Sequence, residues 1–132
     1  AKGDVYAGAF IDGKYSGEGT YYYANGDMYK GTFVNNLLDG YGTLRMADGS
    51  TYEGGFKEGQ YHGNGTYTFA NRSYYTGGFA NGTYNGQGTF VYSTGDKYEG
   101  NFVNGKRSGK GKYSYANGTV QDGIWKDDQF VK

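Results

Sequence analysis

The chain has 132 residues, with 13 basic and 13 acidic side chains, and its formal net charge is zero. Aromatic residues make up 20% of it, Gly contributes 27 residues, and Pro and Cys are absent. The lack of Cys excludes disulfides and thiolate metal sites, and the balanced charge excludes the basic footprint of a nucleic-acid-binding domain. Because disordered chains combine high net charge with few aromatics, we expect a folded chain with a thin, aromatic core.

The first structural unit predicted along the chain occupies residues 6–28. It contains two segments that alternate with a period of two, Tyr6-x-Gly8-x-Phe10 and Gly17-x-Gly19-x-Tyr21. This alternation is typical of β-strands. Asn25-Gly26 predicts a tight hairpin turn with positive φ at both residues, and the Gly13-x-x-x-Gly17 spacing predicts a longer turn. Each unit is therefore expected to fold as strand, turn and strand.

The same unit then recurs every 23 residues, starting near Tyr6, Tyr29, Tyr52, Tyr75 and Tyr98. A degenerate sixth unit begins near Gln121 and keeps Gly123 and Trp125 in register, as expected of an end cap. Self-similarity with such a period is the signature of a repeat array. The sequence therefore predicts a single array over residues 1–132.

No segment of the chain has the pattern of a helix that covers a sheet. We therefore predict an all-β fold: an elongated, twisted, single antiparallel sheet in meander order, with about 10–12 strands built from 23-residue β-hairpin repeats. One face should carry the Tyr, Gly and Phe of each unit. The other face is polar and contains Glu18, Thr20, Thr43, Asn64, Thr66, Gln87, Thr89, Lys110 and Lys112.

Motifs that would indicate catalysis are incomplete. Gly8-x-x-x-x-Gly13-Lys14 and Gly100-x-x-x-x-Gly105-Lys106 imitate a phosphate-binding loop, but the Ser or Thr that should follow is replaced and neither copy precedes a helix. His62 is the only His and has no evident catalytic companion. We predict that the chain is not an enzyme and binds neither a cofactor nor a metal.

The repeat Tyr-x-Gly-x-Phe-x-x-Gly-x-x-x-Gly-x-Gly-x-Tyr resembles the MORN (membrane occupation and recognition nexus) repeat, and residues 97–111 match it almost completely. The departures are Asn36 with Leu37 and Leu38, Arg72, and Gln121. The resemblance implies a non-enzymatic scaffold with a grooved aromatic face and a capacity for phospholipid binding. It also implies a cytoplasmic setting, in a cytoskeletal or ciliary assembly or at a membrane surface.

The main candidate site is a groove on the aromatic face that binds a helix or an extended peptide of a protein partner. Its predicted residues are Tyr29, Phe33, Tyr52, Phe56, Tyr75, Phe79, Tyr98 and Phe102. The alternative is attachment to anionic phospholipid through a basic cluster of Lys106, Arg107, Lys110 and Lys112. The open sheet edges predict a second route of association, end to end with another copy. Nucleic acid is not expected as a partner.

Overall fold

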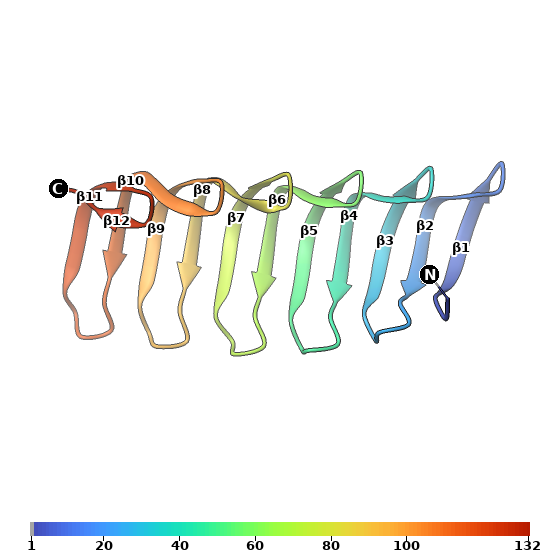
Figure 1. Ribbon diagram of the computed structural model, residues 1–132, viewed down its shortest axis with the longest axis horizontal. Coiled ribbons are helices and arrows are strands. Elements are labelled where there is room, and N and C mark those ends of the chain that lie inside the picture. Colours follow the sequence, from blue (N-terminus) through green and yellow to red (C-terminus); the bar gives the residue numbers. More distant parts are fainter. Residues whose placement is uncertain (1) are drawn as a thin grey trace.

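The computed structural model describes residues 2–132 and contains one antiparallel sheet of twelve strands in meander order (Figure 1). Neither α-helix nor 3₁₀-helix occurs in this part of the chain, so the all-β single-sheet prediction is confirmed. The strands are β1 (Val5–Ile11), β2 (Lys14–Tyr22), β3 (Met28–Val34), β4 (Leu37–Arg45), β5 (Thr51–Lys57), β6 (Gln60–Thr68), β7 (Tyr74–Ala80), β8 (Thr83–Val91), β9 (Lys97–Val103), β10 (Lys106–Ser114), β11 (Val120–Lys126) and β12 (Gln129–Phe130).

The two kinds of turn are the reverse of the predicted assignment. The tight turn lies between the strands of one unit, as at Glu58 (φ 50°) and Gly59 (φ 83°), where both residues have the left-handed conformation of a two-residue hairpin loop. Gly63 lies inside β6, at an irregularity in its pairing with β5. The Asn-Gly segments form the longer turns: Gly26 N–H donates to the Tyr23 carbonyl (3.0 Å), and of Asn25 and Gly26 only Gly26 has a positive φ.

Hydrogen bonds along both rims of the sheet link each unit to the next. On the tight-turn rim, Gly59 N–H donates to the Leu38 carbonyl (2.8 Å), and Gly82 N–H donates to the Tyr61 carbonyl (3.1 Å). On the other rim, the Asp27 carboxylate accepts a hydrogen bond from Ala47 N–H (2.9 Å). The array is therefore held in register at both ends of its strands.

A row of paired glycines crosses the sheet and allows tyrosine rings to lie on the backbone. Gly31 faces Gly42, and a Cβ atom added at Gly31 would lie 2.6 Å from the Gly42 Cα atom. A Cβ atom at Gly42 would lie 2.4–2.6 Å from the ring and hydroxyl of Tyr29, which occupies this space. The Tyr29 hydroxyl donates to the Thr32 carbonyl (2.9 Å). The row runs through Gly8, Gly19, Gly31, Gly42, Gly54, Gly65, Gly77, Gly88, Gly100, Gly111 and Gly123.

The core is a continuous chain of rings in edge-to-face contact. Phe56 packs against Tyr52 of its own unit (5.0 Å between centroids) and against Tyr29 of the preceding unit (5.1 Å). The contact pattern recurs from Phe10 at one end to Trp125 at the other. Such pairs contribute about 0.5–1.5 kcal/mol each beyond their buried area. A one-layer sheet thereby obtains a core.

We expect Gly31→Ala to lower the free energy of unfolding by about 1–3 kcal/mol, because the new Cβ atom collides with the backbone of β4. Gly59→Asn is the control, since Asn36 holds the equivalent turn position with φ 72°. This control should change the free energy by less than about 0.5 kcal/mol. Urea unfolding followed by circular dichroism measures both variants, and equal midpoints would contradict the role given to the glycine row.

Candidate functional site

The eight aromatic residues predicted to line a groove lie in the core. Their exposed fractions are between 0% and 4%, so these side chains have almost no surface to offer a partner. A second layer of side chains covers them: Tyr61 stacks on Tyr52 with 4.0 Å between centroids, and Tyr84 stacks on Tyr75 at 4.1 Å. The accessible aromatic surface therefore belongs to residues that the prediction omitted.

We call this second layer the covering position, and it is occupied by Tyr15, Leu38, Tyr61, Tyr84, Arg107 and Phe130. Each lies nine residues after the first residue of its unit. The same 23-residue register would have identified this position from the sequence. The residue type at the covering position varies more from unit to unit than the residue types at the core positions. The reason is that a covering side chain is packed on one side only.

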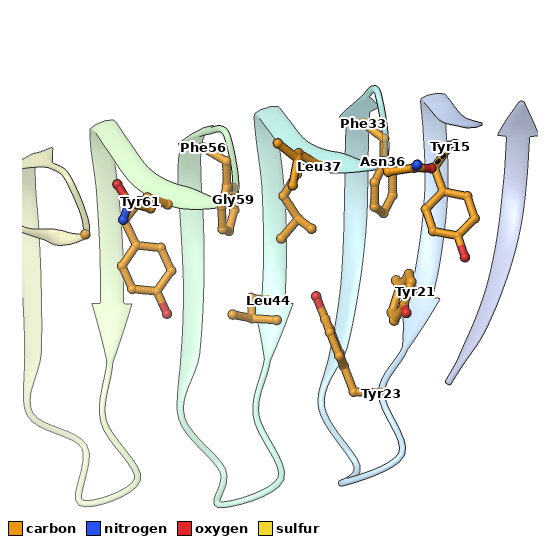
Figure 2. A pocket seen from close by; sticks show the side chains of 13 residues that line it. Tyr15, Tyr21, Tyr23, Phe33, Asn36, Leu37, Leu44, Phe56, Gly59 and Tyr61 are labelled. Atoms are coloured by element: carbon orange, nitrogen blue, oxygen red, sulfur yellow. Dashed lines mark hydrogen bonds between the residues drawn. The ribbon is translucent and has the colours of Figure 1, made fainter. Parts of the chain in front are cut away.

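A hollow of about 520 Å³ on the aromatic face lies over the first three units (Figure 2). It extends from the tight-turn rim, at Asn36 and Gly59, toward the other rim at Tyr23. The lining residues are Tyr15, Tyr21, Tyr23, Phe33, Asn36, Leu37, Leu38, Leu44, Phe56, Gly59, Gln60, Tyr61 and Gly82.

The hollow exists where the repeat departs from its own pattern. All three Leu residues of the chain, Leu37, Leu38 and Leu44, line it. Leu38 takes the covering position that Tyr61 occupies in the next unit, so no ring stacks on Tyr29. The volume that a Tyr side chain would fill is consequently open. Leu37 lies at the mouth with 46% of its surface exposed.

Asn36, which departs from the repeat together with Leu37 and Leu38, stabilises the tight-turn rim beside the hollow. Its side-chain oxygen accepts a hydrogen bond from Tyr15 N–H (2.8 Å), and its own N–H donates to the Tyr15 carbonyl (3.0 Å). Asn tolerates the left-handed conformation that this turn requires. The apolar pair Leu37 and Leu38 is therefore presented by a well-anchored turn.

A second apolar hollow of about 200 Å³ continues the first one along the array. The two share Tyr61 and Gly82, and the second extends over Tyr67, Phe69 and Tyr84. We call the two hollows together the aromatic groove. No charged side chain lines either hollow, and burial raises the pKa of Tyr61 and Tyr84. The groove therefore offers apolar surface with neutral hydroxyl and amide groups at its edges.

The four cations predicted as a lipid site do not form one patch. Arg107 lies on the aromatic face, with its guanidinium 5.0 Å from the ring centroid of Trp125, and Nε donates to the Asp128 carboxylate (3.2 Å). Lys110 and Lys112 point to the opposite face, where Lys112 lies between Glu99 and Asp122 on the adjacent strands. Lys106 lies at the tight turn. Arg107 thus belongs to the covering layer instead of contributing to a free basic surface.

The residues considered for chemistry are dispersed. Within residues 2–132, no group of three or more His, Cys, Asp or Glu side chains comes together as a metal site. No helix in that range is long and apolar enough to cross a bilayer. His62 lies at a polar hollow with Lys57, Glu58, Gln60 and Asn81. Both phosphate-loop imitations fold as strand, tight turn and strand.

Comparison with known proteins identifies the repeat. The family model of the MORN repeat matches residues 6–28, 29–51, 52–74, 75–97 and 98–120. No curated protein matches the chain. Among solved structures, the SAS-4 (dCPAP) TCP domain in complex with a proline-rich motif of Ana2 (dSTIL) of Drosophila melanogaster is similar over 82% of this chain and 72% of that chain. Its sequence identity is 15% and its TM-score is 0.35.

The core tyrosines predict a decrease of stability at alkaline pH. Burial raises the pKa of Tyr29, Tyr52 and Tyr75 from 10.0 to about 12. The folded state then binds more protons than the unfolded state between these values, so stability is fully present below pH 10 and falls as the pH rises toward 12. Between pH 10 and pH 12, we expect the phenolate absorbance to increase and the circular dichroism signal to decrease in parallel. Ionisation of every tyrosine near pH 10 in a folded chain would contradict this expectation.

Proposed function

The chain belongs to the MORN repeat family, and we propose that it is a non-enzymatic docking module whose aromatic groove binds an apolar segment of a partner protein. The coincidence of the three leucines with the hollow of about 520 Å³ carries this proposal. A repeat selected only for its fold would keep at the covering position of every unit a side chain that covers the core rings, as the tyrosines and Arg107 do. Here Leu38 and Arg107 both replace the ring, but only Leu38 lies at a hollow of ligand-binding size, since Arg107 packs on the rings below it.

The lining chemistry supports a peptide occupant. The groove is apolar and uncharged, and its tyrosines combine large rigid surfaces with hydroxyl groups, as the anchor residues of protein interfaces do. Asn36 and Gln60 provide neutral polar groups at the tight-turn rim. We therefore propose that one apolar side chain of the partner enters the hollow beside Leu38, and that the neighbouring partner residues lie against Tyr61 and Tyr84.

The direction of the groove limits the length of the bound segment. The groove crosses the strands, so its occupant runs along the array. Neighbouring strands lie about 4.8 Å apart, so each unit of two strands advances by about 9.5 Å, or about three residues of an extended peptide. A segment of about nine residues would span three units. We propose a cytoplasmic setting in a cytoskeletal or ciliary assembly, on the basis of the family.

Leu38→Tyr tests the groove while restoring the residue type of Tyr15, Tyr61 and Tyr84. The new ring should stack on Tyr29, preserve the fold and block the part of the hollow beside position 38. Peptides selected from a display library on the unmodified protein should lose at least about tenfold in affinity, measured by fluorescence anisotropy.

Tyr41→Ala is the matched control, because Tyr41 is an aromatic side chain of the same unit that lies on the opposite face with 64% exposure. This variant should retain full affinity. Equal binding by the wild-type protein and a folded Leu38→Tyr variant would reject the hollow as the docking site.

Attachment to anionic phospholipid is the second candidate, favoured by the exposed Lys110 and Lys112 on the polar face. Each cation near an anionic surface contributes about 1 kcal/mol, and salt screens the attraction. With Glu99 and Asp122 beside Lys112, we expect sedimentation with phosphatidylserine and phosphatidylinositol bisphosphate vesicles at low salt only, and its loss in Lys110→Glu/Lys112→Glu. Binding that persists at physiological salt would make the lipid surface the main function.

A further inference from the structure

The covering tyrosines repeat along the aromatic groove with constant geometry. Tyr61 stacks on Tyr52 at 4.0 Å between centroids and 21° between ring planes. In the next unit, Tyr84 stacks on Tyr75 at 4.1 Å and 22°. Figure 1 shows the strands side by side, with little change of direction from β4 to β9. Equivalent ring surfaces are therefore separated by the width of two strands, about 9.5 Å.

This separation matches one turn of a polyproline II helix, which has three residues per turn and advances about 9.3 Å in that turn. Every third residue of such a segment meets an equivalent surface, and the mismatch over two units is only about 0.4 Å. Two turns of an α-helix cover about 10.8 Å, so the mismatch of a helix over the same distance is about 2.6 Å. A β-strand returns to the same face every two residues, or about 6.7 Å, which does not divide the period of the groove.

The polar groups of the groove suit a backbone that has no internal hydrogen bonds. Within residues 2–132, the Tyr61 and Tyr84 hydroxyls donate to no other residue, whereas the Tyr52 hydroxyl in the core donates to the Gly55 carbonyl (2.8 Å). No buried side-chain N or O atom in this range lacks a partner, so both free hydroxyls reach solvent. A polyproline II segment exposes its carbonyl groups, and a Tyr hydroxyl can donate to them.

The uncharged lining also favours a segment with few N–H donors. No carboxylate, the strongest acceptor for a peptide N–H, lines either hollow. A donor that is buried without an acceptor lowers affinity. Pro has no N–H, so a proline-rich backbone supplies acceptors for the tyrosine hydroxyls and leaves few donors unpaired. The hydrogen-bonding groups of the groove and of such a segment are therefore complementary.

We propose that the aromatic groove takes a proline-rich segment in the polyproline II conformation, with an apolar residue at every third position facing the sheet. The inference rests on the proposed docking function and names the class of segment. One apolar residue enters the hollow beside Leu38, and the next two lie at the units of Tyr61 and Tyr84. Pro keeps the free segment close to its bound conformation, which lowers the entropy lost on binding.

Labelled peptides of nine residues test the period by fluorescence anisotropy. The probe contains three Pro-Pro-Leu units. The comparison peptide, Pro-Leu-Pro-Leu-Pro-Pro-Pro-Pro-Leu, has the same composition, but its Leu residues lie two and five positions apart. We expect the unmodified protein to bind the probe at least about tenfold more tightly than the comparison peptide. Equal affinities, or no binding of the probe at about 1 mM, would overturn the inference.

Tyr61→Phe/Tyr84→Phe tests the hydrogen bonds, because it removes both free hydroxyls and keeps both rings. The affinity for the probe should fall at least about fivefold. Tyr41→Phe is the matched control, since it removes a hydroxyl from the opposite face, and it should bind the probe as the unmodified protein does. Full affinity of a folded Tyr61→Phe/Tyr84→Phe variant, with folding checked by circular dichroism, would contradict the proposed donation to the peptide backbone.

Peptides selected from a display library distinguish this inference from the docking function on which it rests. We expect the selected sequences to be rich in Pro, with an apolar residue at every third position, and to bind Leu38→Tyr at least about tenfold more weakly. Selected peptides that lose affinity for Leu38→Tyr but lack this pattern would overturn the polyproline II occupant and retain the groove as the docking site. Selected peptides that bind Leu38→Tyr and the unmodified protein equally would overturn both.

Discussion

The contact between a tyrosine ring and a pair of glycines on neighbouring strands is the interaction on which this structure depends. A single sheet has no second layer of secondary structure to bury its apolar face, so its core must be built from side chains that lie on their own backbone. Tyr29 can do this because Gly31 and Gly42 have no Cβ atoms in its path. Each Phe then seals the gap between two such tyrosines, and the array becomes a linear core in which each unit completes its neighbour.

This use of the rings determines where function resides. The core Tyr and Phe residues are constrained from below by glycine and from the sides by edge-to-face contacts, which leaves the covering position as the place where a unit can change without loss of the fold. Leu38 at this position opens the hollow. Arg107, also at this position, does the reverse: it packs against three aromatic rings and Asp128, and covers the core of the fifth unit. Variation at one position thus produces both an opening and a closure.

The two ends of the array show what a unit requires from its neighbours. At the unit that begins near Gln121, Trp125 replaces the Phe of the repeat and is buried, and its indole N–H donates to the Gly111 carbonyl (3.0 Å), so a larger ring and a hydrogen bond join this unit to β10. In the first unit, Phe10 and Gly8 are exposed, whereas Phe33 at the position equivalent to Phe10 is buried.

The sequence alone determined the repeat length, the alternation of faces, the aromatic nature of the core and the meander order, because all of these follow from a period of two within a period of 23. It also marked Asn36, Leu37 and Leu38 as departures. Only the tertiary structure decided that the eight core rings are inaccessible, since their burial comes from the covering position and from adjacent units. The structure also placed the tight turn at Glu58 and Gly59. Both Gly-containing segments of a unit could form a tight turn, and only the pairing register of the strands shows which one does. The faces of the basic residues were decided in the same way, by the bulged pairing between β9 and β10 that sets Arg107 among the rings and Lys110 and Lys112 on the opposite side.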